Sequence, residues 1–243
     1  IRRPPRSTLS SSSAASDVYK RQQLKVYLMT YLELVNEVLR RLREDTVTTV
    51  SQTTYSTMIG DIVNDAKTAV ESAWDWSALR GTISFNTTAD DATYSLSGTT
   101  DQLKVIDAIN DTSNIFLHYQ TPTWFTNNKY NTGTVTSSPA NYTFIGLDGS
   151  GSTEIELWPI PDGVYALKFN IINRTGALSS DSNPTAIPHM PIVHLAYAYA
   201  ARERGETGGR TAGELLSNAQ LYLSDAIALD SAKNPEELIY RAV

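Results

Sequence analysis

The fold is decided by residues 53–85, whose sequence is TTYSTMIGDIVNDAKTAVESAWDWSALRGTISF. Within this stretch the spacing of the apolar residues changes from the helical period to the extended one. Up to Leu79 these residues fall on one broad stripe, which predicts a helix over roughly Thr53–Leu79. The stripe is formed by Tyr55, Met58, Ile59, Ile62, Ala66, Ala69, Val70, Ala73 and Trp74. The charged residues that lie outside it are Asp61, Asp65, Lys67 and Glu71.

From Gly81 to about Asn173 the chain consists of short apolar runs rich in Thr, Tyr, Phe, Val and Ile, which predict β-strands. Turn residues such as Asp148-Gly149 and Pro161-Asp162-Gly163 separate the runs. The candidate strands are Thr82–Phe85, Thr93–Leu96, Lys104–Ile109, Ile115–Tyr119, Tyr142–Gly146, Glu154–Trp158 and Tyr165–Ile172.

A further helix is predicted on the N-terminal side of residue 53. It begins at Thr30, which forms a capping box with Glu33. Arg40, Arg41 and Arg43 fall in its last turn, where cations suit the helix dipole. Its apolar residues, at helical spacing, are Leu32, Val35, Leu39 and Leu42.

Two more helices are predicted after a polar loop over Thr175–Pro188. The first follows Pro191 and runs to about Glu203, and the second closes at Asp230. The glycines that end the first are Gly205, Gly208 and Gly209. The apolar residues of the second are Leu215, Leu216, Ala219, Tyr222, Leu223, Ala226 and Ile227.

This order of elements predicts an α+β fold, because helices at both ends of the chain enclose a strand-rich block. The helices are expected to form a four-helix bundle from residues 29–80 and 176–233. An antiparallel β-rich domain over residues 81–175 is expected to be inserted between the second and third helices. A leader over residues 1–28 and a tail over residues 234–243 complete the division.

The leader has a composition of its own. Residues 1–22 combine Arg2-Arg3-Pro4-Pro5-Arg6 with a Ser/Ala run and show no apolar periodicity. They resemble translated sequencing-adapter sequence, so we set them aside and take Met29 as the expected start. An Arg- and Ser-rich transit peptide is the alternative, but Pro4-Pro5 does not suit an amphipathic helix.

The charge of the chain disfavours nucleic acid as a ligand. The formal net charge is −6, from 20 basic and 26 acidic residues. The leader holds six of the basic residues and one of the acidic ones, which leaves 14 against 25. A chain this acidic repels phosphate, so DNA is expected to pass it without specific binding.

The sequence carries no motif that predicts catalysis or a cofactor, so the protein is expected not to be an enzyme. It has no Cys, and no HExxH or Gly-x-Ser-x-Gly pattern occurs. Its three histidines, His118, His189 and His194, do not cluster with other ligand residues. We therefore predict no catalytic, cofactor-binding or metal-binding residues. No run of about 18 apolar residues predicts a membrane span.

Several tryptophans are candidates for core or interface positions. Trp74 is interpreted as a core residue and Trp158 as part of the strand packing. Trp124 and Phe125 precede the polar stretch Thr126–Ala140, which is expected to be a flexible loop. An aromatic pair beside such a loop is a candidate partner interface.

Four segments together resemble a known family. They are Trp74-Asp75-Trp76-Ser77, the strand block, Glu156-Leu157-Trp158-Pro159-Ile160-Pro161, and the Ala/Tyr-rich segment Leu195-Ala196-Tyr197-Ala198-Tyr199-Ala200-Ala201-Arg202. This set is similar to the head-to-tail adaptors of podoviruses, the tail tubular protein A-like or gatekeeper family. The resemblance rests on element order and short patterns from Met29 to Asp230.

The resemblance implies a structural virion protein in the neck of a short-tailed phage, assembled in the host cytoplasm. Family members form a homo-oligomeric ring of about twelve copies between the portal protein and the tail nozzle or tail fibre protein. Genomic DNA passes through such a ring during ejection. We expect association to bury the Ala-rich faces of neighbouring protomers, and excess carboxylates to line or flank the channel.

The tail is the expected portal-binding element, because C-terminal segments of related adaptors reach into clefts between portal subunits. Pro235 ends the last helix, and Leu238, Ile239 and Tyr240 are the predicted apolar anchors. An ordinary frayed terminus is the alternative for this segment. Two rival function classes are a carbohydrate- or partner-binding β module of a phage tail and an enzyme with a dispersed site.

Overall fold

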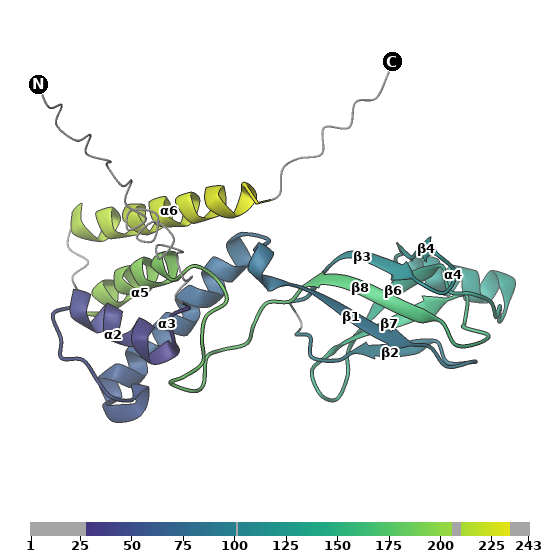
Figure 1. The fold of residues 1–243 in the computed structure, drawn as a ribbon, viewed down its shortest axis with the longest axis horizontal. Coiled ribbons are helices and arrows are strands. Elements are labelled where there is room, and N and C mark those ends of the chain that lie inside the picture. Colours follow the sequence, from purple (N-terminus) through teal and green to yellow (C-terminus); the bar gives the residue numbers. More distant parts are fainter. Residues whose placement is uncertain (1–27, 101, 206–209, 234–243) are drawn as a thin grey trace, which may run out of the picture.

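The computed structural model describes residues 28–100, 102–205 and 210–233, and in these the chain forms a helical lobe and a β lobe that lie end to end (Figure 1). The helices are α2 (Tyr31–Arg41), α3 (Thr54–Ala73), α4 (Pro122–Thr132), α5 (His189–Glu203) and α6 (Arg210–Ser231), with short 3-10 helices η1 (Val50–Gln52) and η2 (Ser77–Leu79). The strands are β1 (Arg80–Asn86), β2 (Thr93–Leu96), β3 (Lys104–Asn110), β4 (Ile115–Phe116), β5 (His118–Tyr119), β6 (Asn141–Leu147), β7 (Thr153–Trp158) and β8 (Ala166–Ile172). The mixed α+β class is confirmed.

Helix α2 begins as the sequence predicts. Thr30 is the N-cap, its hydroxyl accepts from the backbone N–H of Glu33, and the Glu33 carboxylate accepts from the backbone N–H of Thr30. These reciprocal bonds satisfy N–H groups that the first turn leaves without helical partners. The predicted last turn is corrected at one residue: the helix ends at Arg41, and Arg43 lies beyond it with a φ of 61°.

Helix α3 is shorter than predicted, ending at Ala73 instead of Leu79. Thr53 caps its first turn. At the other end the chain turns back, so that the Trp76 ring is fully buried and its Nε1–H donates to the carbonyl oxygen of Val70 at 2.8 Å. Trp76, and not Trp74, is therefore the tryptophan at the centre of this core, because Trp74 is only partly buried.

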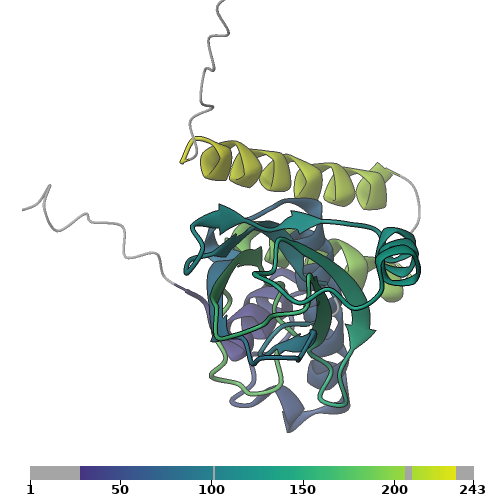
Figure 2. The ribbon, with the colours of Figure 1, turned by 90° about the vertical axis from the view of Figure 1, so that its right-hand side faces the viewer.

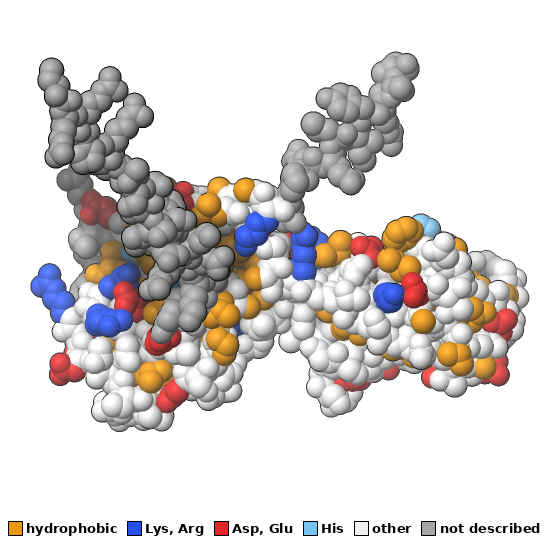
Figure 3. Space-filling view, in the orientation of Figure 1, with side chains coloured by type: hydrophobic (Ala, Val, Ile, Leu, Met, Phe, Trp, Pro, Cys, Tyr) orange, Lys and Arg blue, Asp and Glu red, His pale blue; other side chains and the backbone are white. Residues whose placement is uncertain are grey.

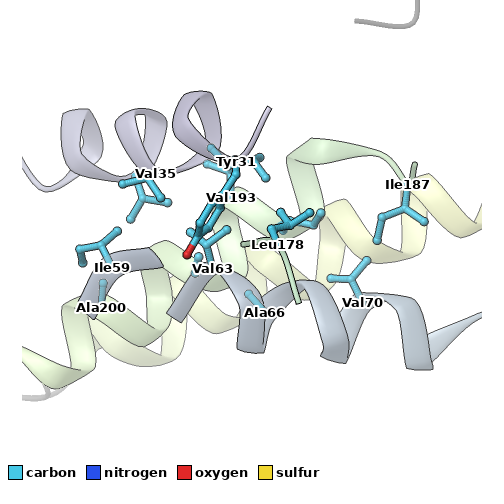
Figure 4. Close-up of a cluster of buried hydrophobic side chains, with 14 of the residues drawn as sticks. Tyr31, Val35, Ile59, Val63, Ala66, Val70, Leu178, Ile187, Val193 and Ala200 are labelled. Atoms are coloured by element: carbon cyan, nitrogen blue, oxygen red, sulfur yellow. The ribbon is translucent and has the colours of Figure 1, made fainter. Parts of the chain in front are cut away.

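The core of the helical lobe is formed by α2, α3 and α5, whose apolar side chains meet between the helices (Figure 4). Helix α6 contributes Ala226 to this core and packs chiefly on α5. The predicted four-helix bundle is therefore not confirmed. Three helices share the centre, and α6 forms an outer layer over one of them (Figure 1).

The β lobe contains two four-stranded sheets, with strand orders β1-β8-β3-β4 and β2-β7-β6-β5. All pairs are antiparallel except β5 with β6. Seen end-on, the sheets face each other (Figure 2) and enclose a second core that includes Leu157, Leu167 and Phe169. The predicted strand 115–119 is divided in two: β4 pairs in the first sheet and β5 in the second.

The predicted flexible loop over Thr126–Ala140 is wrong for its first half, which belongs to α4. Thr121 caps this helix by accepting from the backbone N–H of Trp124, and Pro122 occupies the first turn. The helix ends at Gly133, whose φ of 71° suits a residue without a Cβ. It contacts the strand β6 at the side of the second sheet.

Candidate interaction surfaces

An apolar groove of about 640 Å³ lies on the β lobe between β3 and the segment that crosses to the second sheet. Several large apolar side chains at this place are exposed, Phe116 by 60%. Contiguous exposed apolar surface of this kind marks interaction sites in soluble proteins. The residues that line the groove are Leu103, Lys104, Val105, Ile106, Asp107, Ala108, Phe116, Leu117, His118, Tyr119, Tyr142 and Phe144.

Aromatic rings from the second sheet line the groove. The ring centroids of Tyr119 and Phe144 lie 5.7 Å apart, and Tyr142 packs edge-on against both Tyr119 and Phe144. Burial raises the pKa of Tyr142, and the neighbouring Tyr119 and Asp107 add to the rise. The groove thus offers a neutral aromatic surface that suits apolar or aromatic side chains of a partner.

One edge of the groove is an open strand edge. β3 pairs with β8 from Lys104 to Asn110, with a shift in register at Ile106, but on its other side β4 pairs only with Ile109 and Asn110. Among the described residues no strand pairs with this side of β3 between Lys104 and Asp107. Free backbone groups on an edge strand are a ready template for one more strand.

The predicted interface pair Trp124–Phe125 lies on α4 and not in the groove. Phe125 is buried, so only the partly buried Trp124 offers surface to a partner. The predicted anchors Leu238, Ile239 and Tyr240 lie outside the described residues. Sequence reasoning missed the groove. The signal that could have indicated it is the apolar content of the short segment from Ile115 to Tyr119.

A buried ion pair within α3 is hydrogen-bonded to the segment that returns from the β lobe. The Lys67 Nζ lies 3.0 Å from a Glu71 carboxylate oxygen, and the two side chains are 1% and 2% exposed. Lys67 also donates to the carbonyl oxygens of Thr175 and Gly176, and the Thr175 hydroxyl donates to Glu71. The prediction that Lys67 and Glu71 lie outside the buried stripe is therefore corrected.

Two further polar links cross the junction of the lobes. Ser77 donates from its backbone N–H and its hydroxyl to the buried carboxylate of Asp230, at 2.8 and 2.5 Å. Lys104 at the start of β3 forms an ion pair with Asp75. Burial alone would raise the pKa of Asp230, but the bonds from Ser77 and from Lys233 outweigh it and lower that pKa.

The outer face of α6 is a second exposed surface. Leu221 and Leu229 point away from the core, and Leu229 is 73% exposed. The inner face packs on α5, where the His194 and Tyr222 rings stack at a centroid distance of 3.9 Å. The expectation that the Ala-rich helix faces join neighbouring copies is corrected for α5, because Ala196 and Ala200 are already buried within the chain.

In the part of the chain that the structure describes, no cluster of three His, Cys, Asp or Glu residues could hold a metal ion. Over the same residues, no helix combines the length and the apolar character that crossing a membrane requires. The exposed apolar groove on the β lobe and the exposed outer face of α6 favour the class of proteins that act by contact with partners.

The comparison with protein families agrees with this class. The sequence model described as SU10 adaptor protein matches residues 29–237, which is most of the chain. The chain belongs to the SU10 adaptor protein family, and it is accordingly a structural adaptor protein of a bacteriophage particle that contacts other capsid or tail proteins. No curated protein matches the chain.

Proposed function

We propose that this adaptor forms the ring between the portal protein and the tail nozzle or tail fibre protein of a short-tailed phage, a podovirus. The observation that carries the proposal is the family match over residues 29–237, since it covers both lobes. A ring of about twelve copies would follow the symmetry of the adaptors that the sequence resembles. Its role is that of a conduit for DNA, without a chemical reaction.

The two-lobed shape supports this role. The lobes lie end to end (Figure 1), so one protomer has a helical end and a β end for different partners. The exposed apolar residues of α6 are available for contact between neighbouring copies, which the buried alanines of α5 are not. The groove and Trp124 supply contact surface at the β end.

The portal contact is proposed for Leu238, Ile239 and Tyr240. These residues follow α6, whose last turn lies beside the junction of the lobes through the bonds from Ser77 to Asp230. Apolar residues in a short extended segment can enter a cleft of a partner and bury their side chains there. The partner would then be the portal protein encoded beside this chain.

Electron microscopy tests the proposal. The chain is imaged alone and after mixing with the portal protein, and a ring seated on the portal is the expected result. A variant with Leu238, Ile239 and Tyr240 all replaced by alanine should lose the portal contact. The matched control is Tyr130→Ala, because Tyr130 is a large exposed residue on α4. A well-formed portal that binds neither the unaltered chain nor the Tyr130→Ala control would contradict the adaptor ring.

The aromatic groove favours a second candidate function, a carbohydrate- or partner-binding β module of a phage tail. Aromatic rings in a concave surface suit the apolar faces of sugars as well as protein side chains. Absence of portal binding, together with glycan binding that Tyr119→Ala abolishes, would favour this module over the ring.

A further inference from the structure

We propose that residues 234–243 dock as an added strand on the open edge of β3 of the same chain and cover the apolar groove. The proposal concerns the protomer before assembly, and it goes beyond the adaptor role because it assigns an occupant to a surface within the chain. The occupant is the segment that directly follows Lys233.

The groove combines two features that proteins usually cover. The side of β3 from Lys104 to Asp107 carries no neighbouring strand among the described residues. Directly beside it the apolar side chains of Ile106 and Phe116 are 48% and 60% exposed. An apolar patch next to an open strand edge promotes pairing between chains, so a protomer that stays soluble at high concentration gains from a cover.

The segment starts at the near end of the groove. Lys233 Nζ lies 3.5 Å from the Ser77 hydroxyl oxygen, and Asp75, two residues before Ser77, forms the ion pair with Lys104. Lys233, two residues beyond the end of α6, is thus linked to the first residue of β3 through residues 75–77. In the space-filling view, apolar side chains gather on the upper side of the β lobe, the side on which α6 lies in the helical lobe (Figure 3).

The length is sufficient. Ten extended residues span at most about 33–36 Å, and the seven residues of β3 span about 23 Å. The segment can therefore cross from Lys233 to Lys104 and still follow the open part of β3. Because it enters at the Lys104 end, it would run parallel to β3.

The composition fits a strand in that position. Ile239, Tyr240 and Val243 favour extended structure, and Pro235, which has no backbone N–H, stands before the part that would pair. In a strand, Leu238 and Tyr240 lie on one face, where they can reach the aromatic rings of the groove.

Charge order points to the same direction. Along β3 the basic Lys104 comes before the acidic Asp107, whereas along the segment the acidic Glu236 and Glu237 come before the basic Arg241. A strand parallel to β3 therefore places unlike charges near each other at both ends of the pairing. The antiparallel direction would place like charges together.

The same apolar residues are those proposed above for the portal contact. Docking would keep them on the protomer until a portal is offered, so the groove would act as a holding site. The test of docking contains no portal, and its failure is therefore distinguishable from failure of the adaptor role.

Hydrogen exchange read by mass spectrometry tests the docking. The full chain is compared with a chain that ends at Lys233, at the same low concentration. Backbone amides of Lys104–Ala108 are expected to exchange at least about tenfold faster in the shortened chain. Amides of α2, at the far end of the helical lobe (Figure 1), should be unchanged and serve as the internal control.

Point variants separate docking from a general effect of truncation. Tyr240→Asp in the full chain should raise exchange in β3 as truncation does, and so should Phe116→Asp, which changes the groove at an exposed side chain. Tyr130→Asp is the matched control and should leave β3 unchanged. Equal exchange of β3 in the full and shortened chains would overturn the proposal. So would protection that grows with protein concentration, since the occupant would then be a second copy.

Discussion

The Lys67–Glu71 pair places two opposite charges in the buried part of the helical lobe. Both charges are removed from water, and each is satisfied by its partner and by the returning segment at Thr175. Burying two charges costs several kcal/mol, and their mutual attraction offsets this only while both are present. Removing one of them leaves the other buried without its counter-charge.

We therefore expect Lys67→Met to lower the free energy of unfolding by about 3–5 kcal/mol. Urea unfolding measures this. The double variant Lys67→Met/Glu71→Leu should recover part of the loss, since no lone charge remains, although the carbonyl oxygen of Gly176 still loses its donor. The control is Lys168→Met, whose exposed partner Asp111 stays solvated, so that the change should be within about 1 kcal/mol. A single variant as stable as this control would contradict the role given to the pair.

Gly60 permits the close approach of α2 to α3. A Cβ at this position would lie 2.4 Å from the Tyr31 hydroxyl oxygen and 2.8 Å from a methyl carbon of Val50. We expect Gly60→Ala to destabilise the fold despite the better helix propensity of alanine. Gly213 on α6 has open space around it, so Gly213→Ala should stabilise by about 0.5–1 kcal/mol. Thermal unfolding of the two variants should shift in opposite directions, and shifts of equal sign would refute this account.

Residues of the same type were predicted with different success, because tertiary contacts decide which of them are buried. Trp74 and Trp76 are two positions apart, and helical spacing favoured Trp74 for the core. The helix ends at Ala73, however, and the turn after it brings the Trp76 ring to the Val70 carbonyl. Lys67 was placed outside the apolar stripe by its charge, because the segment that satisfies it is more than a hundred residues away.

At the level of elements, strands were predicted best. The seven candidate strands lie where strands are found, because alternation and turn residues are local signals. Helix α4 was missed, since its Thr- and Asn-rich sequence has neither helical stripe nor strong propensity. The overlooked signal is Thr121 followed by Pro122, a cap and a first-turn proline. The groove was missed although the apolar segment Ile115–Tyr119 offered a signal, because its extent depends on how far β4 runs along β3.

The contact between α5 and α6 should depend on pH. Burial lowers the pKa of His194, as does Arg41, while Glu37 opposes them; His189 is lowered by burial as well. A histidine with a lowered pKa in the folded state binds its proton less readily there than in the unfolded chain. Its contribution to stability is complete above the ordinary pKa of about 6.5 and is lost as the pH falls through the lower, folded value.

We expect urea unfolding midpoints to decrease from pH 7.5 to pH 5.5, above the range where carboxylates titrate. His194→Phe keeps a ring that can stack on Tyr222 but has no proton to bind. The variant should therefore show a smaller decrease, and His189 should supply the remainder. An unchanged pH dependence in the variant would show that protonation of His194 does not weaken this contact.

At the scale of the whole molecule, the lobes are joined by polar links on both chain connections. Lys67 and Glu71 are bonded to the segment that returns from the β lobe. Ser77, in the segment that leads to the β lobe, donates to Asp230. The link from Asp75 to Lys104 lies beside them. These contacts oppose rotation of one lobe against the other, so a partner bound at the β end acts on a body that includes α6.

The net charge of the whole chain bears on its relation to DNA. The formal charge is −6, and it is more negative from residue 29 onward because six basic residues precede that position. Such a protein repels the phosphate backbone, and the repulsion is strongest at low salt. We expect no shift of duplex DNA in gel electrophoresis at about 50 mM salt for a chain that starts at Met29.

The full chain is the informative comparison for this experiment. If it alone shifts DNA at low salt, the binding belongs to the basic residues 1–28 and should vanish near physiological salt, as contacts to phosphate do. A shift by the chain from Met29 that persists at about 150 mM salt would instead require a basic patch strong enough to override the net charge. In that case the protein would grip DNA, and a conduit that lets the genome slide past would be the wrong description.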